Sequence, residues 1–332
     1  MKIISPIASG NGAHVVHKML AENIKNYQLI SYHPYRTLFP PSLFSVGKNI
    51  KADLVHTYAD YGYFHAHRNV PLFLTFHGFA LDNFMRPYLT RLQNLHRLTD
   101  LKLFTALSLK RADYISAVSQ YTANKVKKEL NLNQEIKVIY NGVDHQRFIP
   151  SEKRIKQSNK IKVLFCGNLG LRKGTHWLPL IAEKLPKNIV IQYTSGLRNI
   201  PASYSHSNLQ CLGKVNYLDM HQIYQQADIF LFPSVREGFG LVIAEAMSCG
   251  LPVVSSNCSA IPELVHHERG GILCEIGNIQ QFVDGIKMLA ENPPLRKEYG
   301  EYNREKVCQK FTLMRMALEY REYFDEALSI RQ

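Results

Sequence analysis

Apolar segments of strand length alternate with amphipathic segments along the first half of the chain. Strands are predicted at 2–8, 28–32, 54–58, 72–76, 114–118 and 137–139, and a helix at about 13–24. Strands that are separated by helices are expected to lie parallel in one sheet, joined by right-handed crossovers. This half of the sequence therefore predicts an α/β domain.

The second half repeats the alternation after a break. Residues 151–160 are polar and charged, and we expect the linker between two domains there. Strands are predicted at 161–165, 189–193, 209–212, 229–232 and 253–254, helical segments between them reach about 290, and a last helix spans about 313–330. With 332 residues, the chain is long enough for two domains with substantial cores. The predicted fold class is α/β, with two similar halves.

One predicted helix of the second half carries charge in an unusual position. From Leu241 to Met247 every residue except Glu245 is apolar, which predicts a helix buried on nearly all sides. A second carboxylate, Glu237, lies eight residues earlier. A buried carboxylate needs hydrogen-bond donors, because desolvating it alone costs several kcal/mol. An incoming ligand can supply these donors to Glu245, and so can a distant Arg or Lys of the protein.

The turn that precedes this helix is open enough to admit an anion. Gly238 and Gly240 leave the backbone accessible where the first helix amides are unpaired, an arrangement suited to phosphate. The turn also follows the strand at 229–232, and ligands gather at the carboxyl ends of strands in open α/β sheets. A nucleotide-sugar offers hydroxyls to the glutamates and phosphates to the helix start. The alternative is that the glycines serve only the turn.

Residues 227–264 resemble the donor-site signature of retaining glycosyltransferase family four, also called group 1. The likeness covers the two glutamates, the glycine turn between them, the helix exit at 250–254 and the Pro-Glu pair at 262–263. It implies the GT-B fold, in which two Rossmann-like domains face each other across a cleft. The implied domains are 1–150, which binds the acceptor and receives the helix at about 313–332, and 160–310, which binds the nucleotide-sugar.

The resemblance also implies roles for individual residues. His77 ends the strand at 72–76 and resembles the histidine that lies beside the transferred sugar, so we assign it to the catalytic site together with Glu237. Glu245 would accept hydrogen bonds from the ribose. The donor-binding residues would be Gly10, Gly12, Gly167, Arg172, Lys173, Gly238, Phe239, Gly240, Leu241 and Glu245.

Two of these donor segments have plain alternatives. The family has an arginine directly after the first glycine of the turn at 167–174 and a lysine five positions later. Lys173 keeps its place, but Asn168 stands at the arginine position, and we expect Arg172 to supply the missing charge. A solvated basic turn is the alternative there, and a simple tight turn is the alternative at Gly10 and Gly12. No Asp-x-Asp pair occurs, so we expect neither a metal nor a cofactor.

The charge of the chain is uneven. Of a formal net +13, residues 1–150 carry +9 (18 Lys and Arg against 9 Asp and Glu) and residues 151–332 carry +4 (22 against 18). Such a field suits phosphorylated substrates, anionic lipid or nucleic acid, or it only keeps the surface soluble. No aromatic-basic recognition motif is evident, so no nucleic-acid partner is expected. Between 84 and 110, apolar residues recur at helical intervals with arginines between them, which fits a helix packed on its domain or contact with an anionic membrane.

The remaining features place the protein in the cytoplasm, with possible peripheral contact at the inner face of the membrane. Six cysteines form no CxxC pair, the first ten residues are too short for a signal peptide, and no apolar run approaches the ~18 residues that span a bilayer. We therefore expect a metal-independent retaining hexosyltransferase that uses a UDP-sugar such as UDP-glucose and extends a glycan or lipid-linked acceptor in polysaccharide biosynthesis. The alternatives are an epimerase or phosphorylase on the same fold, or a basic nucleic-acid-binding protein.

Overall fold

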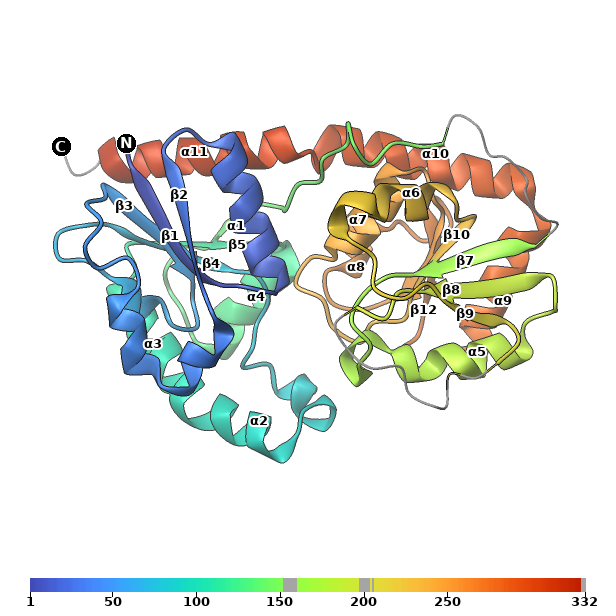
Figure 1. The fold of residues 1–332 in the computed structure, drawn as a ribbon, viewed down its shortest axis with the longest axis horizontal. Helices are drawn as coiled ribbons and strands as arrows, with labels where there is room; N and C mark the ends of the chain where they lie inside the picture. Colours follow the sequence, from blue (N-terminus) through green and yellow to red (C-terminus); the bar gives the residue numbers. More distant parts are fainter. Residues whose placement is uncertain (152–159, 197–203, 205, 330–332) are drawn as a thin grey trace. The chain divides into compact units, whose positions relative to one another are not determined.

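The computed structural model describes residues 1–151, 160–196, 204 and 206–329. The chain divides into two compact units, which are Met1–Gly142 with Leu313–Gln332, and Val143–Thr312 (Figure 1). The boundary after Gly142 precedes the linker expected at 151–160. Apart from its two end residues, that linker lies outside the described residues.

The first unit contains one six-stranded parallel sheet. Its strands stand in the order β2-β1-β3-β4-β5-β6, and every pair is parallel. Their bounds are β1 Ile3–Ala8, β2 Tyr27–Tyr32, β3 Leu54–Tyr58, β4 Leu72–Phe76, β5 Tyr114–Ala117 and β6 Lys137–Val138. Strand order reverses between β1 and β3, so the carboxyl ends of these strands form the topological switch point of the unit.

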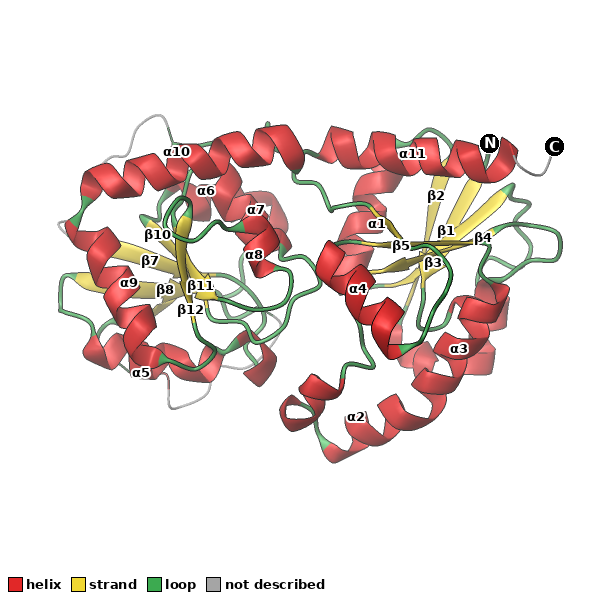
Figure 2. Cartoon of the chain, turned by 180° about the vertical axis from the view of Figure 1, so that it is seen from behind, coloured by secondary structure: helices red, strands yellow, loops and turns green. Residues whose placement is uncertain are grey.

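Helices cover both faces of this sheet (Figure 2). Strand β4 shows why, because its side chains alternate between the faces. Leu74 joins a buried cluster with Val126 of α4, whereas the ring of Phe73 lies 4.9 Å from that of Phe324 on α11. The helices are α1 Gly12–Asn23, α2 Arg91–His96, α3 Lys102–Arg111, α4 Gln120–Glu129 and α11 Leu313–Ser329, with shorter turns η1 Pro34–Leu38, η2 Pro40–Ser45, η3 Gly62–His65, η4 Asn83–Tyr88 and η5 Arg97–Leu101.

The stretch from 84 to 110 is interrupted once, because η4 ends at Tyr88 and a continuous helical run then leads from Arg91 through the π-helical η5 to Arg111. Pro87 stands inside η4, and Thr90 then starts α2 with a capping box that pairs it with Gln93. Met85 is buried, but Leu92, Leu95 and Leu98 are exposed. The alternative in which this segment packs wholly on its own domain is therefore wrong for these three leucines.

The second unit contains a second six-stranded parallel sheet, ordered β12-β11-β10-β7-β8-β9. The strands are β7 Ile161–Phe165, β8 Ile189–Tyr193, β9 Leu209–Cys211, β10 Ile229–Phe232, β11 Val253–Ser256 and β12 Gly271–Cys274. Its helices are α5 Leu178–Lys184, α6 Met220–Gln225, α7 Leu241–Ser248, α8 Ile261–Leu264, α9 Ile279–Glu291 and α10 Pro293–Lys310, with turns η6 Leu171–Lys173, η7 Thr175–Trp177 and η9 Tyr217–Asp219. This order is that of the Rossmann fold, with the switch point between β7 and β10. The sequence patterns missed β12, a short edge strand.

Candidate functional site

The predicted donor residues of the second unit meet at this switch point. The loop after β7 carries Gly167, Arg172 and Lys173, and the loop after β10 carries Glu237 and the glycine turn. The two loops are joined through the carbonyl of Arg172, which accepts a hydrogen bond from Val235 N at 2.9 Å.

A glycine allows this close approach. Gly174 has a φ of 66°, and a Cβ at this position would lie 1.9 Å from the carbonyl oxygen of Pro233. No other residue fits there without moving the loop. Gly174 therefore holds the basic turn of η6 against the loop after β10 and brings Lys173 to the carboxylate of Glu237.

Lys173 and Glu237 form the centre of an ionic cluster. Lys173 Nζ lies 2.6 Å from Glu237 Oε1, Ser234 Oγ donates to the same oxygen at 2.6 Å, and Arg172 Nη1 lies 3.8 Å from it. Burial would raise the pKa of Glu237, but the two cations and these hydrogen bonds outweigh burial and lower this pKa below its ordinary value of 4.5. Glu237 is thus an ionised carboxylate inside the protein.

The turn between Glu237 and α7 keeps the start of the helix open. Gly240 is the N-cap of α7, with a φ of 107° and no side-chain capping bond. Phe239 is buried, and its ring lies 5.6 Å from that of Phe311. Leu241 begins the helix and is half-buried, so the apolar environment predicted for α7 is complete only from Ile243 onward.

Glu245 finds its donors in tyrosine hydroxyls. Tyr224 Oη donates to Glu245 Oε2 at 2.8 Å, and no cation among the described residues lies within ion-pair distance. Burial raises the pKa of Glu245 to about 7, although hydrogen bonds from Tyr224 and Tyr217 and the charge of Arg147 oppose the rise. A distant Arg or Lys that would lock this side chain is therefore not found in the described part of the chain.

The remaining predicted residues belong to the first unit. His77 directly follows β4, and its Nε2 lies 2.9 Å from Nε2 of His17. Gly10 has a φ of 83°, and neither Gly10 nor Gly12 has an atom within 4 Å of where a Cβ would stand. The turn before α1 is thus open, and α1 is capped by the side chain of Asn11.

Asn168, which stands at the arginine position of the family, does not point into the ionic cluster. Its side chain lies over Gly196, where an added Cβ would come within 2.3 Å of Asn168 Oδ1. Arg172 instead reaches the ionic cluster, and its Nη1 donates to the carbonyl of Arg236 at 3.1 Å. The cluster therefore holds two cations in spite of the substitution at 168.

Sequence reasoning missed the partners of these residues. Ser234, Tyr224 and His17 were not singled out, although each touches a predicted site residue. His17 left a signal, since it lies on the apolar face of α1 with Val16 and Leu20. Within the described ranges, no group of three or more His, Cys, Asp or Glu side chains is suited to a metal ion, and no helix is both long and apolar enough to cross a membrane.

Two doubly wound parallel sheets, one with an ionic cluster at its switch point, have the architecture of the GT-B fold. The model for "Glycosyltransferase Family 4" matches residues 3–147, and the model for "Glycosyl transferases group 1" matches residues 146–306. The chain therefore belongs to the family four, group 1 glycosyltransferases.

Individual relatives are distant. An uncharacterized glycosyltransferase of Methanocaldococcus jannaschii is 28% identical over 243 residues, which are 69% of this chain and 62% of that protein, so the chain spans less than two thirds of it. The N-acetyl-alpha-D-glucosaminyl L-malate synthase of Bacillus anthracis is 22% identical over 330 residues, 92% of this chain and 83% of that protein.

Solved structures share the fold over nearly the whole chain. A sucrose-phosphate synthase from Thermosynechococcus elongatus has a TM-score of 0.86 at 18% identity, covering 99% of this chain and 100% of that one. The Anabaena protein HepE, in complex with UDP and glucose, has a TM-score of 0.80 at 20% identity, covering 98% and 99%. At these identities the likeness establishes the fold.

Proposed function

We propose that this glycosyltransferase transfers a hexose from a UDP-sugar such as UDP-glucose to a glycan or lipid-linked acceptor in polysaccharide biosynthesis, with retention of configuration and without a metal. The observation that carries the proposal is the ionised Lys173–Glu237 pair beside the open start of α7. The UDP complexes of HepE support the choice of donor, because they show that this fold accommodates that nucleotide.

Glu237 has one oxygen to spare for the sugar. Its contacts with Lys173, Ser234 and Arg172 all end on Oε1, and Oε2 takes no hydrogen bond from the described residues. We propose that Oε2 accepts from a sugar hydroxyl, while the ion pair keeps the carboxylate charged and fixed in place. Positive charge that develops on the sugar would be stabilised by the same carboxylate.

The two cations suit the leaving group. Cleavage of the bond between the anomeric carbon and the phosphate oxygen leaves both bonding electrons on the diphosphate. We propose that Lys173, Arg172 and the free amides at the start of α7 stabilise this charge. The donor-facing motifs contain no evident nucleophile, which favours same-face attack by the acceptor hydroxyl, with its proton passing to the leaving phosphate.

We propose that Glu245 binds the ribose. Its two tyrosine donors leave the carboxylate only partly compensated, since its pKa stays raised to about 7. Two ribose hydroxyls would supply the missing hydrogen bonds and would favour the ionised form. Donor binding should therefore weaken as the pH falls below about 7, because protonated Glu245 accepts poorly.

Thermal shift with nucleotide-sugars tests the donor site. UDP-glucose, GDP-mannose and ADP-glucose are added in EDTA to the wild type, to Glu245→Ala and to Glu298→Ala, a matched control at an exposed position on α10. We expect UDP-glucose to raise the Tm of the wild type and the control, by an amount equivalent to about 3 kcal/mol near 100 times Kd. An undiminished shift in Glu245→Ala would reject Glu245 as a donor ligand.

A labelled-donor assay separates the enzymatic alternatives. A transferase releases UDP and moves labelled glucose only when an acceptor is present. An epimerase changes the sugar without an acceptor, and a phosphorylase needs inorganic phosphate and yields a sugar phosphate. Tight, salt-sensitive binding of nucleic acid without any turnover would instead favour the basic nucleic-acid-binding alternative.

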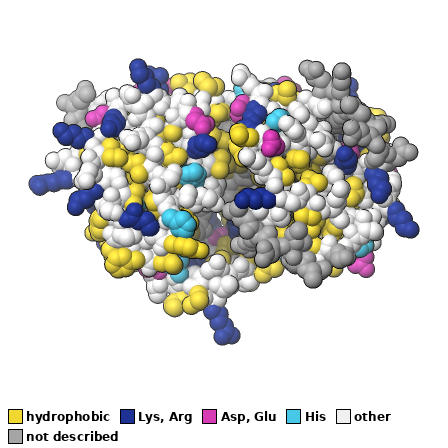
Figure 3. All heavy atoms as spheres, viewed as in Figure 1, with side chains coloured by type: hydrophobic (Ala, Val, Ile, Leu, Met, Phe, Trp, Pro, Cys, Tyr) yellow, Lys and Arg dark blue, Asp and Glu magenta, His cyan; other side chains and the backbone are white. Residues whose placement is uncertain are grey.

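We further propose that the first unit docks on an anionic membrane through an apolar–basic surface. Two segments carry its exposed apolar side chains, which are Tyr35, Leu38, Phe39, Phe44, Leu92, Leu95, Leu98 and Leu103. Leu38 is 81% and Leu92 79% exposed. Clustered apolar side chains with this exposure are typical of an interaction surface. Cations interleave with them, namely Arg36, Arg86, Arg91 and Lys102. Figure 3 shows hydrophobic side chains beside Lys and Arg over this unit.

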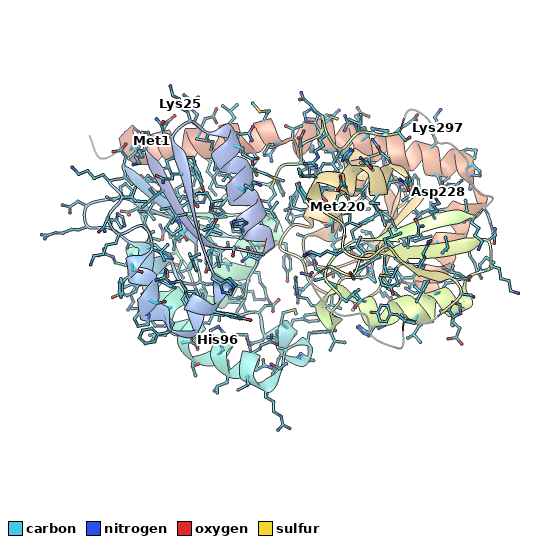
Figure 4. All side chains as sticks on the ribbon, viewed as in Figure 1. Met1, Lys25, His96, Met220, Asp228 and Lys297 are labelled. Atoms are coloured by element: carbon cyan, nitrogen blue, oxygen red, sulfur yellow. The ribbon has the colours of Figure 1, made fainter. Side chains whose placement is uncertain are left out.

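The two segments of the apolar–basic surface share one support. Leu43 of η2 and Leu101 of η5 belong to one buried cluster. Phe64 lies between them, with its ring 4.9 Å from Phe44 and 4.6 Å from Phe104. The exposed Leu92 and Leu95 lie on α2, the helix that also carries His96 (Figure 4), and α2 leads directly into η5, which packs in this cluster through Leu101. A lipid-linked acceptor would meet the enzyme on such a surface.

Vesicle sedimentation tests the membrane proposal. The wild type should bind vesicles that contain phosphatidylglycerol at low salt, and the double variant Leu92→Ser with Leu95→Ser should bind about 100-fold more weakly, since each leucine contributes about 1.5 kcal/mol of burial. Leu180→Ser, which changes a half-exposed leucine of α5, is the control. Equal binding by all three proteins would remove the proposal.

A further inference from the structure

A continuous series of hydrogen bonds crosses the interior of the first unit and ends at His77. We call it the histidine network. It joins side chains from strands β1 to β5 and helices α1 and α11, and its members are Ser5, His17, Tyr27, His56, Thr75, His77, Ser116 and Tyr320. Of these eight residues, only His77 was assigned to the site from the sequence.

His17 is the branch point of the histidine network. Its Nε2 lies 2.9 Å from Nε2 of His77. Its Nδ1 lies 2.7 Å from Ser5 Oγ and 2.8 Å from Tyr27 Oη. From Tyr27 the network continues to His56 Nδ1 at 2.7 Å, and from His56 Nε2 to a threonine hydroxyl of β4 at 2.7 Å.

All three imidazoles are neutral. Burial lowers the pKa of His17 and of His56 well below 6.5, and it lowers the pKa of His77 to about 3. A neutral imidazole carries one N–H, so of two Nε2 atoms in contact one donates and the other accepts. The proton position on His17 therefore dictates the proton position on His77.

The hydroxyls at the other side of His17 select one arrangement. Ser5 and Tyr27 each have one hydrogen to donate, and both hydroxyls lie within hydrogen-bond distance of Nδ1 of His17. A bare Nδ1 has one lone pair and accepts from one of them. We assign this donor to Ser5, the nearer at 2.7 Å, with Tyr27 donating to Nδ1 of His56, and this assignment places the proton of His17 on Nε2. That proton is donated to Nε2 of His77, and the proton of His77 must then reside on its Nδ1.

His77 Nδ1 is the free end of the histidine network. This atom is enclosed and has no hydrogen-bond partner among the described residues. A buried N–H without a partner is costly, so a ligand oxygen that reaches it would be bound strongly. On the basis of the proposed function, that oxygen belongs to the transferred sugar.

We infer that His17 is a positioning residue, which holds His77 as the Nδ1–H tautomer and so presents a neutral N–H donor to the sugar. The inference rests on the proposed function and on the place beside the transferred sugar that the family resemblance implies for His77. The surroundings argue against a purely structural network, because the ring of His56 packs among Phe73 at 5.2 Å and Phe324 at 5.1 Å. Apolar side chains would fill this interior at lower cost than buried imidazoles.

NMR of ¹⁵N-histidine-labelled protein tests the inference without requiring activity. In the wild type we expect His77 as the Nδ1–H tautomer from the nitrogen shifts. In His17→Leu the donor to Nε2 is lost, so His77 should move toward the Nε2–H tautomer, whereas His17→Gln, which keeps an N–H, should restore part of the wild-type pattern. His67→Leu, in the same unit but outside the network, is the control and should change neither reading.

Turnover of UDP-glucose, followed by UDP release, is the second readout. His17→Leu should lower kcat about 10- to 100-fold with less than a 3-fold change in KM for the donor, and His17→Gln should recover at least part of kcat. A wild-type His77 in the Nε2–H form would overturn the inference, as would a loss of kcat in His17→Leu without a change in the His77 shifts. If the nitrogen shifts change as expected but neither the wild type nor any variant turns over a sugar donor, the proposed function is wrong and the inference about the tautomer stands.

A second variant covers the case in which His17→Leu does not fold. Ser5→Ala combined with Tyr27→Phe leaves His17 in place and removes both hydroxyls beside its Nδ1. His77 should then exchange between both tautomers, and a persistent single Nδ1–H form would overturn the inference.

Discussion

The two units bury polar groups in opposite ways. The histidine network of the first unit contains only neutral imidazoles and hydroxyls, whereas the cluster of the second unit contains the charges of Lys173, Arg172 and Glu237. Burial removes charge from the histidines, and no carboxylate among the described residues opposes this effect. In the second unit the cations preserve the charge of the carboxylate. Neutral groups can fix an orientation, whereas the cations of the second unit can also neutralise the charge of a diphosphate.

The same rule separates the two glutamates of the second unit. Glu237 is 7% and Glu245 4% exposed, so burial alone does not distinguish them. The lowered pKa of Glu237 reflects its cations, and the pKa of Glu245, raised to about 7, reflects donors that carry no charge. The ionised Glu237 therefore stabilises the fold above its ordinary pKa of 4.5, and this stabilisation is lost on acidification. The stabilisation from Glu245 is instead lost as the pH rises.

Removal of Lys173, the central cation of the second unit, should have the largest effect on turnover and stability. Lys173→Met leaves Glu237 buried beside only Arg172, and we expect turnover to fall ~10²–10³-fold and the free energy of unfolding to fall by about 3 kcal/mol. Urea denaturation and UDP release measure the two effects, with Lys187→Met, an exposed position, as control.

A double variant shows whether the charge pair is the cause. Lys173→Met with Glu237→Gln removes both charges and should recover most of the stability while turnover stays low. If stability is not recovered, packing around Lys173 and not the buried charge explains the loss.

The sequence predicted the charged site far better than the neutral one. Glycine turns and charged residues at fixed spacing identify a loop after β10, because each residue has a local reason to stand there. The histidine network depends on residues from seven elements, and its members are close only because parallel strands bring Tyr27, His56 and Thr75 side by side. Such contacts leave no periodic or spaced signal in the chain.

Most strands were predictable because their pattern is also local in the sequence. Buried parallel strands are continuous apolar runs, and only β12 escaped, since it begins at Gly271 and has four residues at the sheet edge. The interruption between η4 and α2 was harder to predict. Pro87 is visible in the sequence, but the exposure of Leu92 and Leu95 follows from the path of the chain, which apolar periodicity does not specify.

Glu245→Gln should change how the stability of the protein depends on pH, which distinguishes Glu245 from Glu237. A carboxyl whose pKa is raised in the folded state contributes stability that is fully present below about 4.5 and is lost as the pH rises through about 7. Relative to the wild type, Glu245→Gln should therefore gain about 2 kcal/mol of unfolding free energy between pH 5 and pH 8. Urea denaturation at both pH values measures this, and a pH-independent difference would contradict it.

Ser116→Ala should have the smallest effect, at the end of the histidine network remote from His77. Ser116 Oγ lies 2.8 Å from Thr75 Oγ1, and its loss removes one neutral hydrogen bond, worth about 1 kcal/mol. The loss should be the same at pH 6.5 and pH 8, because burial lowers the pKa of His17 and of His56 well below 6.5 and no charge changes in the network over this range. Turnover should fall no more than about 3-fold, since the tautomer of His77 depends on His17. A pH-dependent loss of stability, measured by the same denaturation as for Glu245→Gln, would mean that a network histidine titrates and that the first unit is not built from neutral groups alone.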